Sequence, residues 1–241
     1  MKSHEKYLQD LRQWLHDTSD CPLEEMSDFF TKRLDGYEEH MSIWEKSYLL
    51  FAEALPSNCQ RILDLGCGTG LELDKIWQKY PDIDVTGVDL CKNMLDKLSE
   101  KHSDKHLTTV CQDYFQYDFS YEKWDAVISF ESLHHFLPER KKELYRNIYN
   151  GLKNSGVFIL GDYIACCDEE LLRSVYLQKR SESAIPEHYF VHFDIPLTLE
   201  HESGLLQNAG FIIEKVLDGS DGATIITARK NVTACASYRE M

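Results

Sequence analysis

The sequence predicts an α/β fold organised around a mostly parallel β-sheet. The short apolar run at 62–65 ends in the glycine-rich segment 66–70, and a helical spacing of apolar residues begins at Leu71. This order of strand, glycine loop and helix brings the loop to the carboxyl end of a strand. The other predicted strands cover 85–89, 107–111, 124–130, 157–160, 211–217 and 224–228. Helical segments separate most of these strands, and that alternation favours parallel neighbours.

The spacing of the glycines restricts the kind of nucleotide that the loop can bind. A dinucleotide fingerprint requires G-x-G-x-x-G/A, but the sixth position is Leu71 when counted from Gly66 and Leu73 when counted from Gly68. No G-K-[ST] follows, so the loop is not a P-loop. Glycines alone also fit a tight turn that binds nothing. Asp89 favours a ligand, because an acid at the end of the second strand is placed to bind ribose hydroxyls.

Two motifs carry a resemblance to a known family. The segment 64–70, D-L-G-C-G-T-G, resembles motif I of class I S-adenosylmethionine (SAM)-dependent methyltransferases, and 124–129, W-D-A-V-I-S, resembles their motif IV. The resemblance implies a Rossmann-like, seven-stranded, mostly parallel sheet with an antiparallel last strand, and SAM as the cofactor. It also implies methyl transfer to a small-molecule acceptor.

The resemblance also assigns cofactor-binding residues. Asp113, with Tyr114 or Phe115, is placed for the adenine, and Asp64 for the glycine loop or the cofactor's ammonium group. The expected cofactor-binding residues are Asp64, Gly66, Cys67, Gly68, Thr69, Gly70, Asp89, Leu90, Met94, Asp113, Tyr114, Phe115, Phe130 and Tyr37.

A general base is needed only if the acceptor must lose a proton. The candidates are His134, His135, His188, His192 and Tyr163, and the sequence does not choose among them. Adjacent residues on a helix do not share a face, so the neighbours His134 and His135 make a poor metal pair. We therefore predict no catalytic metal.

Four regions are expected along the chain. Residues 1–56 form an N-terminal helical cap, with a turn at Asp35–Gly36 and a helix from Tyr37 to Leu55. Residues 57–230 form the SAM-binding domain, which contains a helix–loop insertion at 166–197 over the substrate site, and 231–241 form a tail. Tyr37, His40 and Trp44 are either lid contacts or plain packing. The aromatic loop 186–196 belongs either to the substrate pocket or to a structural arm that packs on a neighbour or a second subunit.

Composition excludes several functions. The formal net charge of -15 disfavours a nucleic-acid partner, because an acidic surface repels phosphates. No apolar stretch is long enough for a membrane span, and the N-terminus lacks the apolar segment of a signal peptide. Eight cysteines without a C-x-x-C pair read as reduced thiols. We expect a cytoplasmic protein, possible as a homodimer, with no membrane partner.

Three alternatives to methyl transfer stay open. A relative in fold that makes a carboxymethyl derivative of SAM needs a basic residue, usually arginine, beside the sulfonium. The strand-end segments contain no arginine, since Arg33, Arg140, Arg173 and Arg180 fall on predicted helices. The second alternative is a non-catalytic SAM-binding protein. The third, a dinucleotide oxidoreductase, is weakened by the missing sixth-position glycine.

Overall fold

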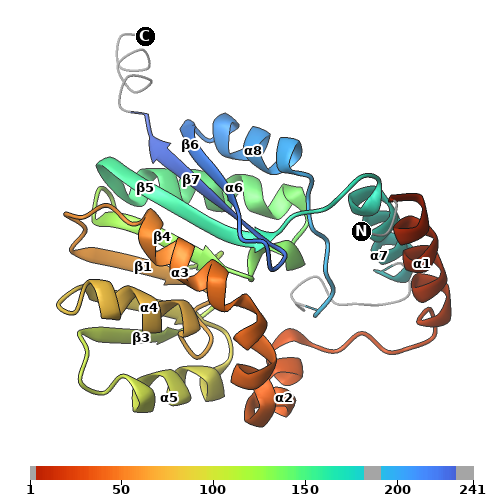
Figure 1. Cartoon of the computed structure of the whole chain (residues 1–241), viewed down its shortest axis with the longest axis horizontal. Coiled ribbons are helices and arrows are strands. Elements are labelled where there is room, and N and C mark those ends of the chain that lie inside the picture. Colours follow the sequence, from red (N-terminus) through yellow and green to blue (C-terminus); the bar gives the residue numbers. More distant parts are fainter. Residues whose placement is uncertain (1–3, 182–190, 232–241) are drawn as a thin grey trace.

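A single mixed sheet organises the chain (Figure 1). The computed structural model describes residues 4–181 and 191–231. Within these residues seven strands pair in the order β3-β2-β1-β4-β5-β7-β6. Their bounds are β1 Arg61–Leu65, β2 Asp84–Asp89, β3 Leu107–Cys111, β4 Trp124–Phe130, β5 Leu152–Tyr163, β6 Phe211–Asp218 and β7 Ala223–Lys230. The strands β1 to β5 are parallel, and β7 is antiparallel to both β5 and β6, so the predicted fold is confirmed.

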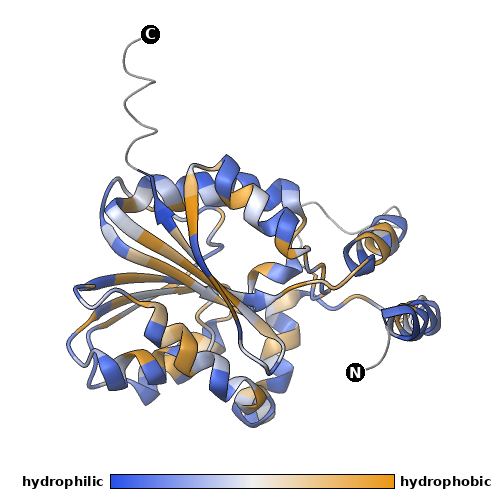
Figure 2. Cartoon of the chain, turned by 45° about the horizontal axis from the view of Figure 1, so that its top comes forward, coloured by the Kyte–Doolittle hydropathy of each residue, from blue (hydrophilic) through white to orange (hydrophobic). Residues whose placement is uncertain are grey.

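Helices cover both faces of the sheet. One face packs against α3 (Glu45–Ala54), α4 (Leu71–Lys79) and α5 (Lys92–Lys101). The other packs against α6 (Pro138–Gly151) and α8 (Leu199–Asn208). Because β1, β4 and β5 are buried on both faces, they are apolar along most of their length, as Figure 2 shows by their colour.

The N-terminal helices depart from the prediction at Gly36. The predicted turn at Asp35–Gly36 is wrong, since α2 runs through it from Met26 to Met41. A Cβ on Gly36 would meet no atom within 4 Å, so glycine there relieves no packing conflict. Glu25 begins the helix by accepting a hydrogen bond from the Asp28 backbone nitrogen at 3.0 Å. The helix predicted over 37–55 is divided among the end of α2, the 3-10 turn η1 (Ser42–Trp44) and α3.

The fifth strand begins earlier than the sequence predicts. The predicted strand covers 157–160, but β5 already begins at Leu152 and includes the polar segment 154–156. Ser155 adopts a positive φ of 67°, and the pairing register with β4 shifts between Trp124 and Ala126. The strand therefore continues through the turn-forming residues, and its pairing with β4 is irregular there.

A separate lobe stands beside the sheet. It consists of α1 (His4–Asp17) and α7 (Glu169–Ser181), which lie side by side in Figure 1. Leu11 and Leu15 of α1 pack with Phe193 and Ile195 of the chain that leads to α8. The expected cap is thus divided: α1 belongs to the lobe, α2 lies at the edge of the sheet, and α3 packs on the sheet itself.

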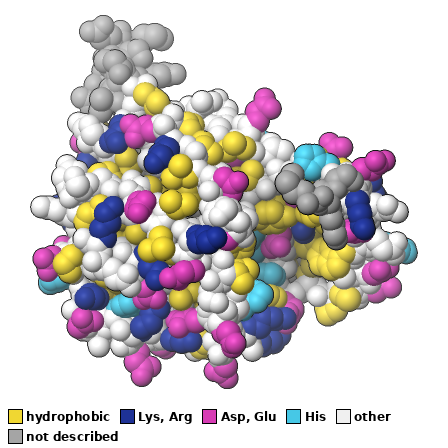
Figure 3. Space-filling model, viewed as in Figure 1, with side chains coloured by type: hydrophobic (Ala, Val, Ile, Leu, Met, Phe, Trp, Pro, Cys, Tyr) yellow, Lys and Arg dark blue, Asp and Glu magenta, His cyan; other side chains and the backbone are white. Residues whose placement is uncertain are grey.

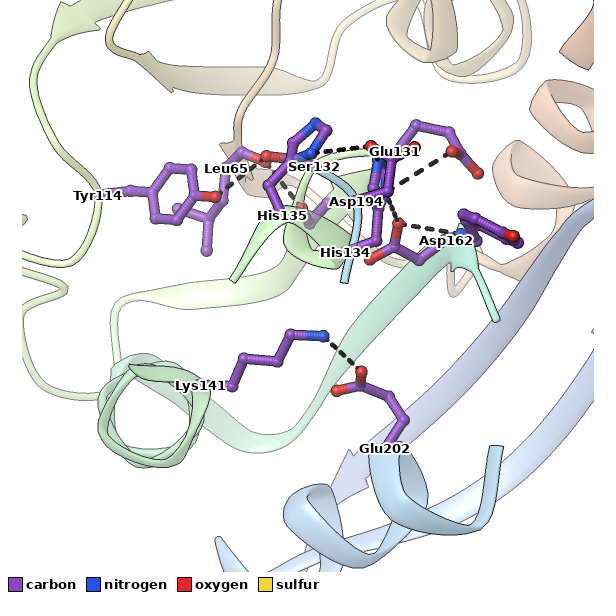
Figure 4. Close-up of polar contacts among 12 residues, drawn as sticks. Leu65, Tyr114, Glu131, Ser132, His134, His135, Lys141, Asp162, Asp194 and Glu202 are labelled. Atoms are coloured by element: carbon purple, nitrogen blue, oxygen red, sulfur yellow. Dashed lines mark hydrogen bonds and ion pairs between the residues drawn. The ribbon is translucent and has the colours of Figure 1, made fainter. Parts of the chain in front are cut away.

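A buried ion pair joins α6 to α8. Lys141 donates to Glu202 at 2.6 Å, and both residues are 1% exposed. Tyr145, one turn further along α6, donates to the other oxygen of Glu202. The carboxylate is thereby satisfied inside the core, far from the sheet edge where the loops gather (Figure 4).

Two predictions from composition can be compared with the described residues. No helix among them is long and apolar enough to cross a membrane. Each described cysteine is a free thiol, in agreement with the predicted absence of a disulfide framework.

Candidate functional site

The glycine loop between β1 and α4 opens one side of its backbone to a cleft. Gly66 and Gly68 have φ values of +75° and +48°, which favour glycine. A Cβ on Gly66 would lie 2.1 Å from the Ser132 hydroxyl oxygen, whereas the nearest atom to a Cβ on Gly68 is the Tyr37 hydroxyl at 3.5 Å. Gly66 therefore packs under the loop, and Gly68 presents bare backbone to the cleft.

Asp89 holds this loop to the end of β2. Its carboxylate accepts hydrogen bonds from the backbone nitrogens of Gly68 at 2.9 Å and Cys91 at 2.8 Å. Burial raises the pKa of Asp89, and these donors oppose the shift. The carboxylate lines a cleft that we call the loop cleft, with Gly66, Gly68, Tyr114 and Phe130 among its other walls.

Two carboxyl groups without donors lie buried behind the loop. Asp64 is 0% exposed and Glu72 6%. Neither oxygen of Asp64, nor Glu72 Oε1, has a hydrogen-bond partner among the described residues. Burial and the nearby Glu72 carboxylate raise the pKa of Asp64 well above its ordinary value, and burial raises that of Glu72 to about 7. Such a pair can stabilise a cationic group that enters beside it.

Most of the expected cofactor-binding residues gather in the loop cleft or beside it. Those that line the loop cleft are Tyr37, Gly66, Gly68, Asp89, Leu90, Met94, Asp113, Tyr114 and Phe130. Cys67, Thr69 and Gly70 line a smaller side pocket together with Glu72. Phe115 lies elsewhere: it packs against Tyr114 and Phe136 at the edge of the core, with the Arg140 guanidinium 4.6 Å from its ring.

A second cleft adjoins the first, and we call it the histidine cleft. Its walls include Phe29, His40, His134, His192 and Asp194. Phe30, Tyr37, Glu131 and His135 line both clefts. Figure 3 shows histidine and acidic side chains in the hollow between the lobe and the main body. The two clefts are therefore neighbours that share part of their lining.

The histidine pair sits in a cluster of carboxylates (Figure 4). His134 and His135 belong to the 3-10 turn η2 (Leu133–His135), at the carboxyl end of β4. His134 Nδ1 lies 2.5 Å from Asp162 Oδ1, and its Nε2 lies 3.6 Å from Asp194 Oδ1. His135 Nδ1 lies 3.3 Å from the same Asp194 oxygen. Glu131 completes the cluster with an oxygen 3.7 Å from His134 Nδ1, and its backbone has an unusual positive φ of 48°.

The ionisable groups of this cluster shift one another's pKa values. Burial opposes the charged imidazole of His134, but the charge of Asp162 and the hydrogen bond to it raise the pKa of His134 to about 9. Burial and the neighbouring His134 charge lower the pKa of His135. Burial opposes the charge on Asp194, yet the two histidines hold its pKa below the ordinary value. His134 is therefore the cationic member and His135 the neutral one.

The remaining base candidates lie in different surroundings. His192 stacks on Phe29 with ring centroids 3.4 Å apart, and burial lowers its pKa to about 4. The Tyr163 hydroxyl points into the lobe, where it donates to Glu169 and lies 3.0 Å from the Tyr7 hydroxyl. His188 lies outside the described residues.

Sequence reasoning did not identify Glu72 and Asp194 as functional. Glu72 stands two positions after motif I, but a helical carboxylate carries no pattern of its own. Glu131 and Ser132 lie in the segment 129–133, which the resemblance places beside the cofactor and the substrate. Asp194 was expected only as part of the aromatic loop 186–196. Its neighbour Ile195 donates its backbone N–H to the His134 carbonyl oxygen at 2.6 Å, a long-range contact that no local pattern predicts.

Comparison with known proteins identifies the kind of domain. The family model described as "Methyltransferase domain" matches residues 62–156, which run from β1 into β5. This part of the chain therefore matches a methyltransferase domain, and the fold is that of class I, SAM-dependent methyltransferases. The predictions of fold and cofactor drawn from motif I are thereby confirmed.

The relatives of this methyltransferase chain are named for a different reaction of SAM. A carboxy-S-adenosyl-L-methionine synthase of Campylobacter lari is 26% identical over 200 residues, which cover 78% of this chain and 84% of that protein. Among solved structures, human N-acetylserotonin methyltransferase in complex with SAM aligns with a TM-score of 0.64 at 18% identity, over 84% of this chain and 56% of that one. A SAM-dependent methyltransferase of Mesorhizobium loti aligns with a TM-score of 0.56 at 20% identity, over 75% of this chain and 95% of that one.

The clefts of this methyltransferase domain fit SAM chemically. The bare backbone at Gly68 leaves space for a ligand at the loop, and the buried, donor-free carboxyl groups of Asp64 and Glu72 suit an ammonium group. Asp89 offers carboxylate oxygens for a diol at the end of β2. SAM carries an ammonium group in its amino-acid part and a diol in its ribose.

Proposed function

We propose that this chain transfers the methyl group of SAM to a small molecule bound in the histidine cleft. The observation that carries the proposal is the shared wall of the two clefts, formed by Phe30, Tyr37, Glu131 and His135. Methyl transfer is an in-line displacement, so the donor and the acceptor must be bound next to one another. Because the same four side chains line both clefts, ligands in the two clefts are neighbours.

Each part of the cofactor has residues suited to it. In this proposal Asp64 and Glu72 face the ammonium group, and Asp89 binds the ribose hydroxyls. Asp113 and Tyr114 border the adenine at the end of β3. The rings of Phe30 and Tyr37 in the shared wall would exclude water from the sulfonium, which limits hydrolysis.

The second candidate function is the carboxymethyl chemistry for which the relatives are named. It requires a cation for the added carboxylate, and the cationic imidazole of His134 is already surrounded by the carboxylates of Glu131, Asp162 and Asp194. Arg33 lines the histidine cleft, but its guanidinium is bound to Glu24 at 2.9 Å and lies over the Phe29 ring. The charge of the site therefore favours methyl transfer.

Analysis of the spent cofactor distinguishes the two reactions. Purified protein incubated with methyl-labelled SAM and a panel of phenols, amines, thiols and carboxylates is expected to yield a labelled acceptor and S-adenosylhomocysteine, detected by mass spectrometry. A cofactor heavier by one carboxyl group, with no labelled acceptor, would establish the carboxymethyl reaction in its place.

Replacement of His192 tests the acceptor side of the proposal. His192→Ala removes the ring stacked on Phe29, and we expect kcat/KM to fall about tenfold or more, because small misplacements of a reactant cost up to about 100-fold. SAM affinity, measured by calorimetry, is expected to stay unchanged. The control is His201→Ala, whose imidazole pairs with Glu170 outside both clefts. Equal activity of the two variants would remove His192 from the acceptor site.

The buried carboxyl pair predicts how SAM binding depends on pH. Glu72 has a pKa of about 7, and an ammonium group binds its ionised form, so binding below that pH must release a proton. We expect the affinity to rise by up to about tenfold per pH unit as the pH approaches 7, and then to level off. Calorimetry in buffers of different ionisation enthalpy measures both the affinity and the released proton. Glu72→Gln should flatten the profile, and an unchanged slope in that variant would exclude Glu72 as its cause.

A further inference from the structure

We propose that His134, His135 and Asp194 bind a divalent transition-metal ion, such as Zn²⁺, in the wall of the histidine cleft. His134 contributes Nε2, His135 contributes Nδ1, and Asp194 contributes Oδ1. One ligand atom from each of these three side chains lies within 4.8 Å of the others. Two imidazoles and one carboxylate are a ligand set that zinc and related ions accept.

The separations between these atoms are those of ligands around one ion. Two atoms bound at about 2.1 Å in tetrahedral geometry are about 3.4 Å apart. Asp194 Oδ1 lies 3.6 Å from His134 Nε2 and 3.3 Å from His135 Nδ1. Both distances exceed the usual length of a hydrogen bond between a nitrogen and an oxygen. The three side chains thus surround a point without pairing closely with each other.

One of the three ligand atoms is buried without a hydrogen bond. His135 is 8% exposed, and its Nδ1 makes no hydrogen bond of acceptable geometry within the described chain. A buried ring nitrogen in this position is costly unless it binds something. Its ring lies against that of His134, with centroids 4.0 Å apart, so both rings face the same region.

Residues behind the ligands hold them in place. Asp162 binds His134 Nδ1 at 2.5 Å and keeps a proton there, as carboxylates do behind metal-bound histidines, so a metal ion at Nε2 would displace the other proton of the cationic ring. The Ile195 N–H donates to the His134 carbonyl oxygen at 2.6 Å and ties the Asp194 segment to η2. Figure 4 shows these groups converging from η2, from the end of β5 and from the chain before α8.

The turn η2 explains why the sequence predicts no metal here. That prediction assumed a helix, on which neighbouring residues diverge. In one short 3-10 turn the two imidazoles instead use different ring nitrogens, Nε2 and Nδ1, to reach the same carboxylate oxygen.

Three protein ligands at the wall of a cleft leave a position for the acceptor. This role rests on the proposed function, whereas the metal site does not. An acceptor hydroxyl bound there loses its proton to water more readily, because the cation stabilises the oxyanion. That oxygen then forms the bond to the methyl carbon as the sulfur–methyl bond breaks, and the bonding electron pair returns to sulfur. The inferred acceptor class is therefore a hydroxyl or phenol.

Direct metal binding tests the site. Tag-free, chelator-treated protein is titrated with Co²⁺ and with Zn²⁺, and we expect one tight equivalent and the intense visible absorption of low-coordinate Co²⁺. His135→Gln and Asp194→Asn are expected to lose at least 100-fold in affinity, while the exposed control His106→Ala keeps it. Thermal melts show whether each variant is folded. Binding that is absent in the parent protein, or equal in folded His135→Gln and Asp194→Asn, would overturn the site.

Activity separates the site from its role. The role requires that the chelator-treated protein lose methyl transfer to hydroxyl acceptors and regain it with Zn²⁺ or Co²⁺. Full methyl transfer by metal-free protein would overturn the proposed role of the metal in activating the acceptor. The titration would still decide whether the metal-binding site exists. Absence of methyl transfer under all conditions, combined with metal binding in the titration, would overturn the proposed function and leave the metal site standing.

Discussion

Asp89→Ala is expected to weaken SAM binding by about 30- to 1000-fold, or about 2–4 kcal/mol, since hydrogen bonds to a charged group contribute about 1.5–3 kcal/mol each. The Asp89 carboxylate has two roles. It is placed to accept from ribose hydroxyls, and it also holds the glycine loop through the Gly68 and Cys91 backbone nitrogens. Its removal loses the ligand contacts and loosens the loop that surrounds them. Isothermal titration calorimetry with SAM measures the loss.

Asp84 provides the matched control for this variant. It begins the same strand, at the opposite edge of the sheet, and its side chain is largely exposed. Asp84→Ala should bind SAM like the parent protein. Asp89→Asn keeps one oxygen acceptor and should fall between the two. Parent-like affinity in Asp89→Ala would mean that the ribose lies elsewhere.

Lys141→Met is expected to lower the free energy of unfolding by about 3–5 kcal/mol, because it leaves the buried Glu202 carboxylate without its charge partner. Tyr145 continues to donate to Glu202 but cannot neutralise it. The pair joins α6 to α8 on the face of the sheet away from α3, so the whole sandwich depends on it. Urea denaturation followed by circular dichroism measures the change.

Two further variants separate charge from packing. Lys142→Met makes the same substitution at the next, exposed position of α6 and should change stability by less than about 0.5 kcal/mol. The double variant Lys141→Met with Glu202→Leu removes both charges and should recover much of the lost stability, as replaced buried ion pairs often do. A double variant as unstable as Lys141→Met would assign the loss to packing rather than to the unpaired charge.

The parts of the fold that the sequence predicts are those where short-range pattern and long-range packing agree. β1 is an apolar run that is buried on both faces, and Gly66 stands where the backbone needs a positive φ. Thr198 caps α8, with its side chain accepting from the His201 nitrogen at 3.2 Å, and threonine is a preferred residue at that position. Gly36 and Ser155 mislead, since each is a turn-forming residue placed inside a longer element that tertiary packing maintains.

The candidate site also has a part that the sequence predicts and a part that it does not. The cofactor side follows strand ends, whose order along the sheet edge comes from topology, so Asp89 and Asp113 could be placed from sequence. The acceptor side depends on contacts between distant segments. Asp194 contacts His135, which lies 59 positions earlier in the sequence. His192 stacks on Phe29 in the wall of the histidine cleft. No local periodicity encodes such meetings.

Helix α2 has a consequence for the timing of the reaction. Phe30 and Tyr37, both on this helix, line the loop cleft and the histidine cleft together. A displacement of α2 that opens one cleft would therefore open the other cleft as well. A ligand bound in either cleft contacts the same helix and would stabilise α2 in the position that also retains the other ligand. If release of either ligand requires α2 to move, we expect that movement to affect the exchange of both ligands.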